Sequence, residues 1–503
     1  MRVAIVGAGP AGLLLAQHLA SPGSPPLDIC VLDRRACPTN NDNAPYSYPI
    51  TLQARGVRAL QGIQDDFVTQ RLAQQSRWIQ QIALHTGPFV QTMSRPEASL
   101  VVEYAALTRE LIRVVKETSQ SESSNPVTFA WDTTVESICW HNQTLVATTD
   151  GSDDEEAKLY SYIPFDLLVA ADGMHSVVRQ SLADYAQTVQ RKDNDSVFDC
   201  RVKPVPGGFI PFSLQPTART TPKQNKKATQ PLTQDAIHGW MSGKQNILAA
   251  FLPERDMDSL HQVDHGTAVF SYTTTESPLK EANTVDDVYK ILGKDLSLYV
   301  SDEEALGLIQ RTPARFVTAE CNRLVEPSCH TVLLGDAAHT FSATINQGAN
   351  AALEDAHVLQ QCIRKCITQN NNEKTVDWSS VLNLYQDQRG PEIEAAQILS
   401  KYALPTKSVV LQIEMIVRML LRKLLPSSWT FTQKYFPPLP MELLPHPNLA
   451  YTDVLQQTSW WTDKVAYAIQ SKNKKGEAYE PDAKDDDSGN AIASKHRIFR
   501  FTQ

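Results

Sequence analysis

The chain has 503 residues, of which 42% are hydrophobic and 20% charged, and its formal net charge is −9 at pH 7. This length and balance indicate two or three folded domains with sizeable cores. The negative net charge argues against nucleic acid as the main partner. No stretch reaches the ~18–20 uncharged apolar residues of a membrane span. No cationic leader precedes the first predicted strand, so we expect a cytoplasmic protein with reduced cysteines.

The amino terminus carries a glycine-rich turn between a strand and a helix. Residues 2–6 are an apolar strand, Gly7, Gly9 and Gly12 follow, and residues 13–20 have a helical pattern. Glycines at these spacings allow a tight turn, close approach of a pyrophosphate, and packing of the helix on the strand. The helix N-terminus would offer free N–H groups to phosphates. The alternative is a tight turn that binds no ligand.

An acidic residue follows the next strand. Residues 27–32 form this second predicted strand, which ends at Asp33. Asp33 lies near the ~20-residue offset of the carboxylate that accepts hydrogen bonds from ribose hydroxyls in dinucleotide-binding folds. The two strands, the helix and Asp33 together favour dinucleotide binding over an empty turn.

Two later segments have a similar strand-to-turn pattern. Residues 166–179 are an apolar strand that ends in Asp172-Gly173 and leads into a helix. Taken alone, this segment is explained by an ordinary Asp-Gly turn. Residues 332–356 are a second apolar strand that ends in Gly335-Asp336, followed by a loop and a helix that opens at Gly348. Paired with the amino-terminal glycines, this segment indicates one extended dinucleotide held at both ends.

The three motifs, in this order and spacing, resemble those of the FAD-dependent aromatic hydroxylases, the flavin monooxygenases of the para-hydroxybenzoate hydroxylase fold. The resemblance spans about residues 1–450 and, within that group, is to kynurenine 3-monooxygenase-like proteins. It is carried further by residues 238–253, 47–60 and 420–443. It implies an α/β fold in which a Rossmann-like FAD-binding domain is interleaved with a sheet-rich substrate domain, with helices at the C-terminus.

The resemblance also implies the cofactor contacts. The ADP half of FAD would be held by Gly7, Gly9, Gly12, Asp33 and Arg34, and the ribityl chain or pyrophosphate by Asp336. Backbone N–H groups at the start of the second helix would lie near the flavin N1–C2=O edge, where a helix N-terminus favours negative charge; this start comprises Gly348, Ala349 and Asn350. The Asp172-Gly173 pair would serve both FAD and NADPH. No second GxGxxG is present, which fits transient binding of NADPH.

The implied reaction transfers one oxygen atom of O₂, by way of a flavin C4a-hydroperoxide, to a small-molecule substrate. The cofactor supplies the difficult chemistry, so no Ser-His-Asp or metal-binding constellation is required. His339, just after Asp336, is either a hydrogen-bonded structural residue or a group that transfers protons.

Two regions near the flavin depart from the family pattern. The loop at residues 340–347 lacks a Pro near the flavin ring, and Asn346 replaces a Gly; Asn tolerates positive φ, so the turn can survive. A flavin-side Arg is replaced by Tyr104, with Arg109 as the alternative. Arg77 matches the Arg that grips the substrate carboxylate and is suited to bidentate binding; the alternative is a surface Arg.

The positions that would assist Arg77 hold Ala403 and Pro440. This favours a different aromatic compound, or a polyketide-, alkaloid- or polyene-like one, over kynurenine. A flavoprotein that does not insert oxygen (an oxidase, reductase or cyclase) is the main alternative, because the loop is altered. A non-enzymatic FAD-binding scaffold is the third.

The pattern along the chain predicts the domain organisation. The FAD-binding domain comprises residues 1–75, 100–190 and 311–400, and the substrate domain residues 76–99 and 191–310. Residues 401–460 form a helical region and residues 461–503 a disordered tail. An amphipathic helix at residues 408–425 either packs on the core or contacts a membrane surface. The oligomeric state is left open.

Overall fold

The computed structural model describes residues 1–477 except residues 39–46, 64–65, 87–88, 150–158, 190–196, 216–231, 243–244, 255–262, 342–344, 371–372, 406–407 and 426–429. The sequence predicts an acidic turn at residues 150–156 and an exposed polar loop at residues 217–234, and the turn and most of the loop lie outside these residues.

A six-stranded sheet carries the amino-terminal motif. Its strand order is β16 (Val325–Glu326), β17 (Thr331–Leu333), β10 (Leu167–Ala170), β1 (Arg2–Val6), β2 (Asp28–Leu32) and β6 (Val127–Ala130). All neighbours are parallel except β16 and β17. Strands β1 and β10 are almost continuously apolar and buried, as is typical of parallel strands covered on both faces.

An eight-stranded sheet forms the second layer. Its order is β15 (Ala314–Cys321), β11 (Cys200–Leu214), β14 (Val263–Tyr272), β13 (Gln245–Glu254), β12 (Ala236–Ser242), β4 (Ser76–Thr86), β5 (Phe89–Glu103) and β3 (Pro49–Leu52). Strands β4 and β12 are parallel, and the other pairs are antiparallel. Two smaller sheets join β7 (Thr133–Cys139), β8 (Thr144–Thr149) and β9 (Leu159–Pro164), and β18 (Ile367–Asn370) and β19 (Glu373–Val376).

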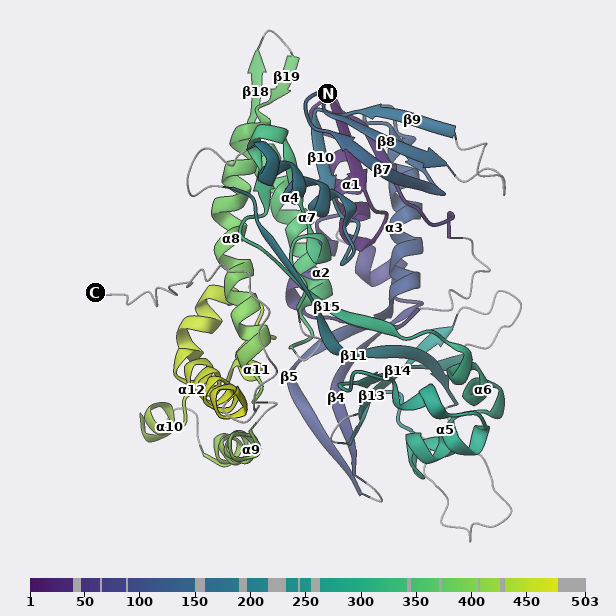
Figure 1. Cartoon of the computed structure of the whole chain (residues 1–503), viewed down its shortest axis with the longest axis vertical. Coiled ribbons are helices and arrows are strands. Elements are labelled where there is room, and N and C mark those ends of the chain that lie inside the picture. Colours follow the sequence, from purple (N-terminus) through teal and green to yellow (C-terminus); the bar gives the residue numbers. More distant parts are fainter. Residues whose placement is uncertain are drawn as a thin grey trace, which may run out of the picture.

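Helices surround the two large sheets (Figure 1). Those near the six-stranded sheet are α1 (Pro10–Ala20), α2 (Ala54–Gln61), α3 (Tyr104–Ser119), α4 (Val177–Val189), α7 (Gly348–Lys365) and α8 (Trp378–Tyr402). Helices α5 (Val285–Leu292) and α6 (Asp302–Gln310) cover the eight-stranded sheet. The C-terminal group is α9 (Val409–Leu424), α10 (Thr430–Tyr435), α11 (Pro440–Leu443) and α12 (Tyr451–Glu477). The predicted α/β fold class, with a sheet-rich second part and C-terminal helices, is confirmed.

The predicted disordered tail is wrong for residues 461–477. Helix α12 continues to Glu477, and Trp461 and Val465 are fully buried in it. These two side chains pack with Leu411 of α9 and with Leu439. The polar composition after residue 470 hid the apolar turns that bury the first part of the helix. Residues 478–503 lie outside the described residues.

The amphipathic helix predicted at residues 408–425 corresponds to α9. Its inner face buries Leu411, whereas Val410, Ile413 and Leu420 are more than half exposed. Among the described residues, no helix is long and apolar enough to cross a membrane.

Candidate functional site: a dinucleotide cradle

The glycine-rich turn closes tightly on the neighbouring strand. Gly7 has φ +106°, and a Cβ there would lie 2.2 Å from the Ala171 carbonyl oxygen. A Cβ on Gly12 would lie 2.2 Å from the Gly7 carbonyl oxygen. Helix α1 begins directly after Gly9, and among the described residues no side chain caps its N-terminus. Its first N–H groups are therefore free of side-chain partners and suited to a phosphate.

Asp33 lies at the end of β2, beside this turn. Its carboxylate accepts hydrogen bonds from the Ala8 N–H and from the Arg35 guanidinium, both at 2.8 Å. Burial alone would raise the pKa of Asp33, but the bonds from Arg35 and Ala8 hold it below its ordinary value. Arg34, the predicted cofactor contact, is exposed. Arg35 was missed, because the chain bends at residues 34 and 35 and no local pattern shows which of the two side chains turns back to Asp33.

Asp336 lies across the sheet from Asp33, after β17. The structure holds this half-buried carboxylate in place through its backbone, because Arg179 donates to the carbonyl oxygens of Asp336 and Ala337 at 3.2 and 2.8 Å. Among the described residues we find no hydrogen bond to the Asp336 carboxylate itself. Burial raises its pKa, which the charges of His339 and Arg179 only partly offset. The carboxylate therefore has acceptor capacity left for a ligand.

Two tyrosines line the space between the glycine turn and Asp336. Tyr104 begins α3 and stacks on Tyr48 with ring centroids 5.6 Å apart. A Cβ on Gly9 would lie 3.3 Å from the Tyr104 hydroxyl. Burial raises the pKa of Tyr48, and Tyr104 and the Asp336 carboxylate add to the effect. We call the space between the glycine turn at residues 7–12, Asp33, Asp336 and the N-terminus of α7 the cradle. Tyr104 is thus the α3 residue at the cradle, and Arg109 lies five residues further along the helix, about 7.5 Å of rise away.

The N-terminus of α7 opens beside Asp336. The helix begins at Gly348, no side chain in the described part of the chain caps it, and a Cβ on Gly348 would meet nothing within 4 Å. The Asn350 side chain is fully buried and contacts the start of α2, where its Oδ1 accepts a hydrogen bond from the Gln53 N–H at 2.7 Å. Only the backbone N–H groups of Gly348, Ala349 and Asn350 are suited to a ligand. Asn346 has φ +53°, as its replacement of a glycine requires.

His339 belongs to a buried ion-pair network behind the cradle. Its Nε2 lies 2.7 Å from Asp355 Oδ2, which also accepts from the Gly335 N–H at 2.8 Å. Arg389 donates to the other Asp355 oxygen at 2.6 Å, and its guanidinium lies 6.0 Å from the Tyr451 ring. His339 is 1% exposed, and its Nδ1 has no hydrogen-bond partner in the described residues. This position supports a role in holding the Gly335-Asp336 turn in place.

Asp172-Gly173 forms the third strand end at the cradle. Asp172 Oδ2 accepts from the Val177 and Val178 N–H groups at 2.8 and 3.3 Å and so caps α4. Its Oδ1 is buried and has no hydrogen-bond partner in the described chain. Burial, the largest effect, raises the pKa of this carboxyl. Gly173 has φ +78°, and a Cβ there would meet no atom within 4 Å.

Arg77 lies apart from the cradle, on β4. It is half-buried, and its Nη1 donates to the Gln234 carbonyl oxygen at 3.2 Å. Its cross-strand neighbour Val101 belongs to an apolar cluster that includes Ala250 of β13. Side chains alternate along a strand, so Ala250 and the half-exposed Leu248 lie on one side of the sheet.

That side of the sheet faces the cradle. Leu248 pairs with Val269 of β14, which shares its side with Phe209 of β11. The Phe209 ring meets the Tyr48 ring edge-on with centroids 5.5 Å apart. The eight-stranded sheet therefore presents an apolar surface next to the tyrosines, and Arg77 borders the same surface.

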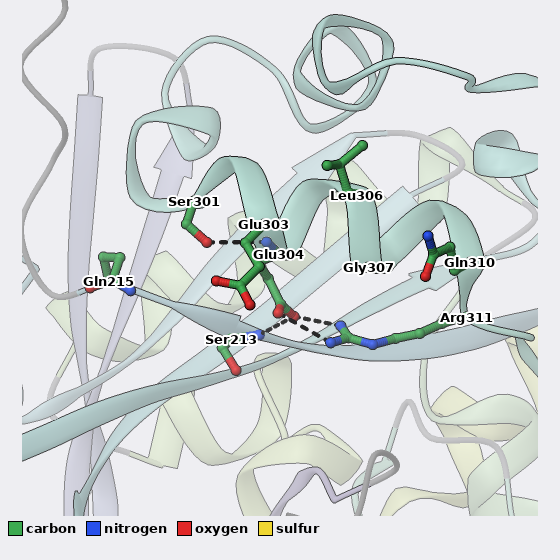
Figure 2. A pocket seen from close by; sticks show the side chains of 9 residues that line it. All are labelled: Ser213, Gln215, Ser301, Glu303, Glu304, Leu306, Gly307, Gln310 and Arg311. Atoms are coloured by element: carbon green, nitrogen blue, oxygen red, sulfur yellow. Dashed lines mark hydrogen bonds and ion pairs between the residues drawn. The ribbon is translucent and has the colours of Figure 1, made fainter.

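A cavity of about 590 Å³ lies elsewhere, between β11 and α6 (Figure 2). Figure 2 shows Glu304 at its centre, where its carboxylate accepts from the Ser213 N–H at 2.8 Å and pairs with Arg311. These polar groups satisfy one another, and none of the lining residues belongs to the cradle. The cavity is thus a polar surface hollow of the second layer.

The cradle residues fit FAD. Two helix N-termini without side-chain caps, a free buried acceptor on Asp172 and an unpaired carboxylate on Asp336 lie at the C-terminal ends of parallel strands. This is the edge of an open α/β sheet at which nucleotides bind. The glycine contacts leave no room for a side chain between strand and helix.

Comparisons with known proteins agree. Residues 1–208 match the FAD binding domain family. The chain is 25% identical over 377 residues to a kynurenine 3-monooxygenase of Salinispora tropica, covering 72% of each chain, and 22% identical over 515 residues to one of Cryptococcus neoformans, covering 93% of each. It has the fold of 2-methyl-3-hydroxypyridine-5-carboxylic acid oxygenase (TM-score 0.58, 17% identity, 80% of this chain and 90% of the other) and of tetracycline destructase Tet(55) (TM-score 0.54, 15% identity, 89% and 97%).

Residues 1–208 thus match an FAD binding domain, and the chain as a whole is similar to FAD-dependent monooxygenases of the aromatic hydroxylase class, as the sequence predicted. Within that class it is similar to the kynurenine 3-monooxygenases over most of its length.

Proposed function

We propose that the protein uses NADPH and O₂ to insert one oxygen atom into an aromatic or unsaturated small molecule held between the cradle and the eight-stranded sheet. The observation that carries this proposal is the contact between Phe209 of the sheet and Tyr48 of the cradle, which brings an apolar surface against the cofactor site.

Each part of the cradle has a task. FAD, when bound, supplies the electron transfer and the activation of oxygen. The glycine turn and the N-terminus of α1 hold the ADP half, with Asp33 and Arg35 beside it. Asp336 and the N-terminus of α7 hold the flavin half, where the helix dipole stabilises negative charge on the ring. Asp172 and Gly173 border both cofactors, because they lie at the strand end between these sites and the chain has no second GxGxxG.

The sheet surface defines the class of substrate. Phe209, Val269 and Leu248 offer apolar contact and exclude water, which strengthens polar interactions inside the site. Arg77 borders this surface and can pair with a carboxylate. The relatives and structural neighbours include a kynurenine 3-monooxygenase, an oxygenase named for a pyridine carboxylic acid, and a protein whose structure holds 2-aminobenzoylacetate. All three compounds are aromatic and carry a carboxylate, so we assign an aromatic acid as the substrate class.

Oxygen-isotope labelling tests the proposal. The purified protein, loaded with FAD and given NADPH under ¹⁸O₂, is offered kynurenine, 2-aminobenzoylacetate and a panel of aromatic acids. We expect one probe to accelerate NADPH oxidation and to gain one ¹⁸O atom by mass spectrometry. NADPH oxidation with no labelled product from any probe that stimulates it contradicts oxygen insertion.

A flavoprotein without oxygen insertion is the second candidate. It is favoured by the altered loop, in which Asn346 takes the left-handed conformation where the related pattern has a glycine. The same experiment separates the two, because an oxidase, reductase or cyclase changes the probe by hydrogen or by ring closure and incorporates no ¹⁸O.

A further inference from the structure

Two cysteines face each other where the chain passes between the two large sheets. Cys200 begins β11 and Cys321 ends β15, and the two residues are directly opposite in the antiparallel register. Both are free thiols and half-buried. On the cradle side of this pair, Phe198 and Leu324 are buried in the core of the six-stranded sheet. The chain therefore enters the eight-stranded sheet at Cys200 and leaves it again at Cys321.

The backbone brings the two side chains close. The Asn322 N–H donates to the Asp199 carbonyl oxygen at 2.9 Å, so Asp199 and Asn322 form a hydrogen-bonded pair of the ladder. The next pair, Cys200 and Cys321, is of the non-hydrogen-bonded kind, in which Cα atoms lie about 4.5 Å apart and side chains are nearest. That separation is within the range of about 4.4–6.8 Å that a disulfide requires.

The surroundings give the two thiols different roles. The Cys321 thiol opposite it and the Arg179 guanidinium lower the pKa of Cys200. The Cys200 sulfur and burial raise the pKa of Cys321. The thiolate is the nucleophile in thiol oxidation. The register places Cys321 directly opposite Cys200, and we assign the attack to Cys200, the thiol with the lowered pKa.

The crossing is coupled to the cradle through β15. Ala319 and Thr340 are joined by two hydrogen bonds, one from the Thr340 N–H at 3.1 Å and one to the Thr340 hydroxyl. Glu320, next to Cys321, forms an antiparallel bridge with His339. Arg179, beside Cys200, donates to the Asp336 carbonyl oxygen at 3.2 Å. A change of geometry at the cysteines therefore acts on the segment that holds Asp336.

We propose that Cys200 and Cys321 are a modification site, which hydrogen peroxide converts into a reversible disulfide that alters FAD binding at Asp336. The Cys200 thiolate attacks one peroxide oxygen, the O–O bond breaks, and hydroxide leaves to become water. The Cys321 thiol then attacks the sulfenic sulfur of Cys200, and the second oxygen leaves as water. Two thiols lose two electrons and two protons, and one peroxide becomes two waters. This site is independent of the substrate assigned above.

Thiol mapping tests the bond. The purified protein is titrated with hydrogen peroxide, remaining thiols are blocked with N-ethylmaleimide, and non-reduced peptides are identified by mass spectrometry. We expect a Cys200–Cys321 linked peptide to form before the exposed Cys139 is oxidised, and to disappear with dithiothreitol. In Cys321→Ser, dimedone should trap a sulfenic acid on Cys200; Cys200→Ser should give neither product. Oxidation of Cys139 ahead of the pair, or no dimedone adduct on Cys200, overturns the proposal.

FAD affinity tests the consequence, with a readout that does not depend on turnover. FAD fluorescence titration of the peroxide-treated protein should give a dissociation constant raised about fivefold, a typical size for coupling between two sites. Dithiothreitol should restore the original value, and Cys200→Ser should show no change with peroxide. Cys139→Ser is the matched control and should behave as the unaltered chain. A linked pair that leaves FAD affinity unchanged overturns the coupling to Asp336.

Discussion

The cradle and the sheet surface opposite it are built from different kinds of residue. At the cradle, Gly7 and Gly12 touch backbone atoms so closely that no side chain fits, and Asp355 is fully buried between two partners. The sheet surface uses Phe209 and Leu248, which are partly exposed and could be exchanged for other apolar residues. Cofactor binding thus depends on positions such as Gly7 and Gly12 that have no room for a side chain, whereas substrate choice depends on positions that can hold other apolar residues.

Breaking the ion pair behind the cradle should have the largest effect. Asp355→Ala leaves the buried Arg389 with Glu354 as its remaining carboxylate partner and the Gly335 N–H without its acceptor, which costs about 3 kcal/mol of unfolding free energy. Urea denaturation measures the loss. Glu276→Gln is the control, because its ion pair with Lys280 is exposed and worth about 0–1 kcal/mol. Equal losses of unfolding free energy in the two variants would show that the Asp355 ion pairs do not stabilise the cradle.

Filling the glycine turn should abolish FAD retention at a smaller cost to the fold. Gly12→Val forces side-chain atoms against the Gly7 carbonyl and displaces the strand from the helix. We expect FAD affinity to fall about 100-fold, which corresponds to about 2.7 kcal/mol. Absorbance of bound flavin after gel filtration reports it. Gly307→Ala, where a Cβ meets only the Arg311 side chain at 3.4 Å, is the control. A fully yellow Gly12→Val protein would contradict the placement of the pyrophosphate.

Acid should weaken the same network. Burial would raise the pKa of Asp355, but His339 and Arg389 lower it to about 2 from an ordinary 3.8. A carboxyl whose pKa is lowered in the fold stabilises above its unfolded pKa and loses that contribution as pH falls through the folded one. Unfolding free energy should therefore drop by about 2 kcal/mol between pH 4 and pH 2. Asp355→Asn should lack this part of the pH dependence; the same drop in that variant would assign it to other groups.

The smallest effect should come from the sheet surface. Arg77→Met removes the cation but keeps much of the apolar stem, so KM for an aromatic acid should rise about tenfold, or about 1.4 kcal/mol. The KM for the methyl ester of the same acid should stay unchanged. Steady-state NADPH oxidation measures both. An equal rise in KM for the acid and the ester would show that Arg77 supports the structure of the sheet and does not bind the substrate carboxylate.

Sequence reasoning identified the parts of the cradle whose chemistry is local. Gly7, Asp33, Asp336 and Gly348 each lie at a strand or helix end that a short pattern predicts, and the structure gathers them at one edge. Sequence reasoning chose Arg34 instead of Arg35, because only the observed turn shows which of two adjacent side chains faces Asp33.

Long-range partners could not be predicted. Tyr451 and Arg389 reach the cradle from helices that follow it by tens of residues, and no local pattern marks either. The backbone N–H of Asn350 was expected near the flavin, and no local pattern showed that its side chain accepts a hydrogen bond from the Gln53 N–H of the segment before α2. Packing between distant elements decides such contacts, and a single sequence does not record it.

Competition between nucleotides tests the central claim most directly, because the cradle is proposed to hold the two ends of one dinucleotide. The apoprotein is titrated with FAD, ADP and FMN, and the dissociation constants are compared in the unaltered chain and in Asp336→Ala. The account predicts that FAD binds far more tightly than ADP or FMN, and that Asp336→Ala weakens FAD and FMN but leaves ADP unchanged. Equal affinity for FAD and ADP, or a loss of ADP binding in Asp336→Ala, would contradict it.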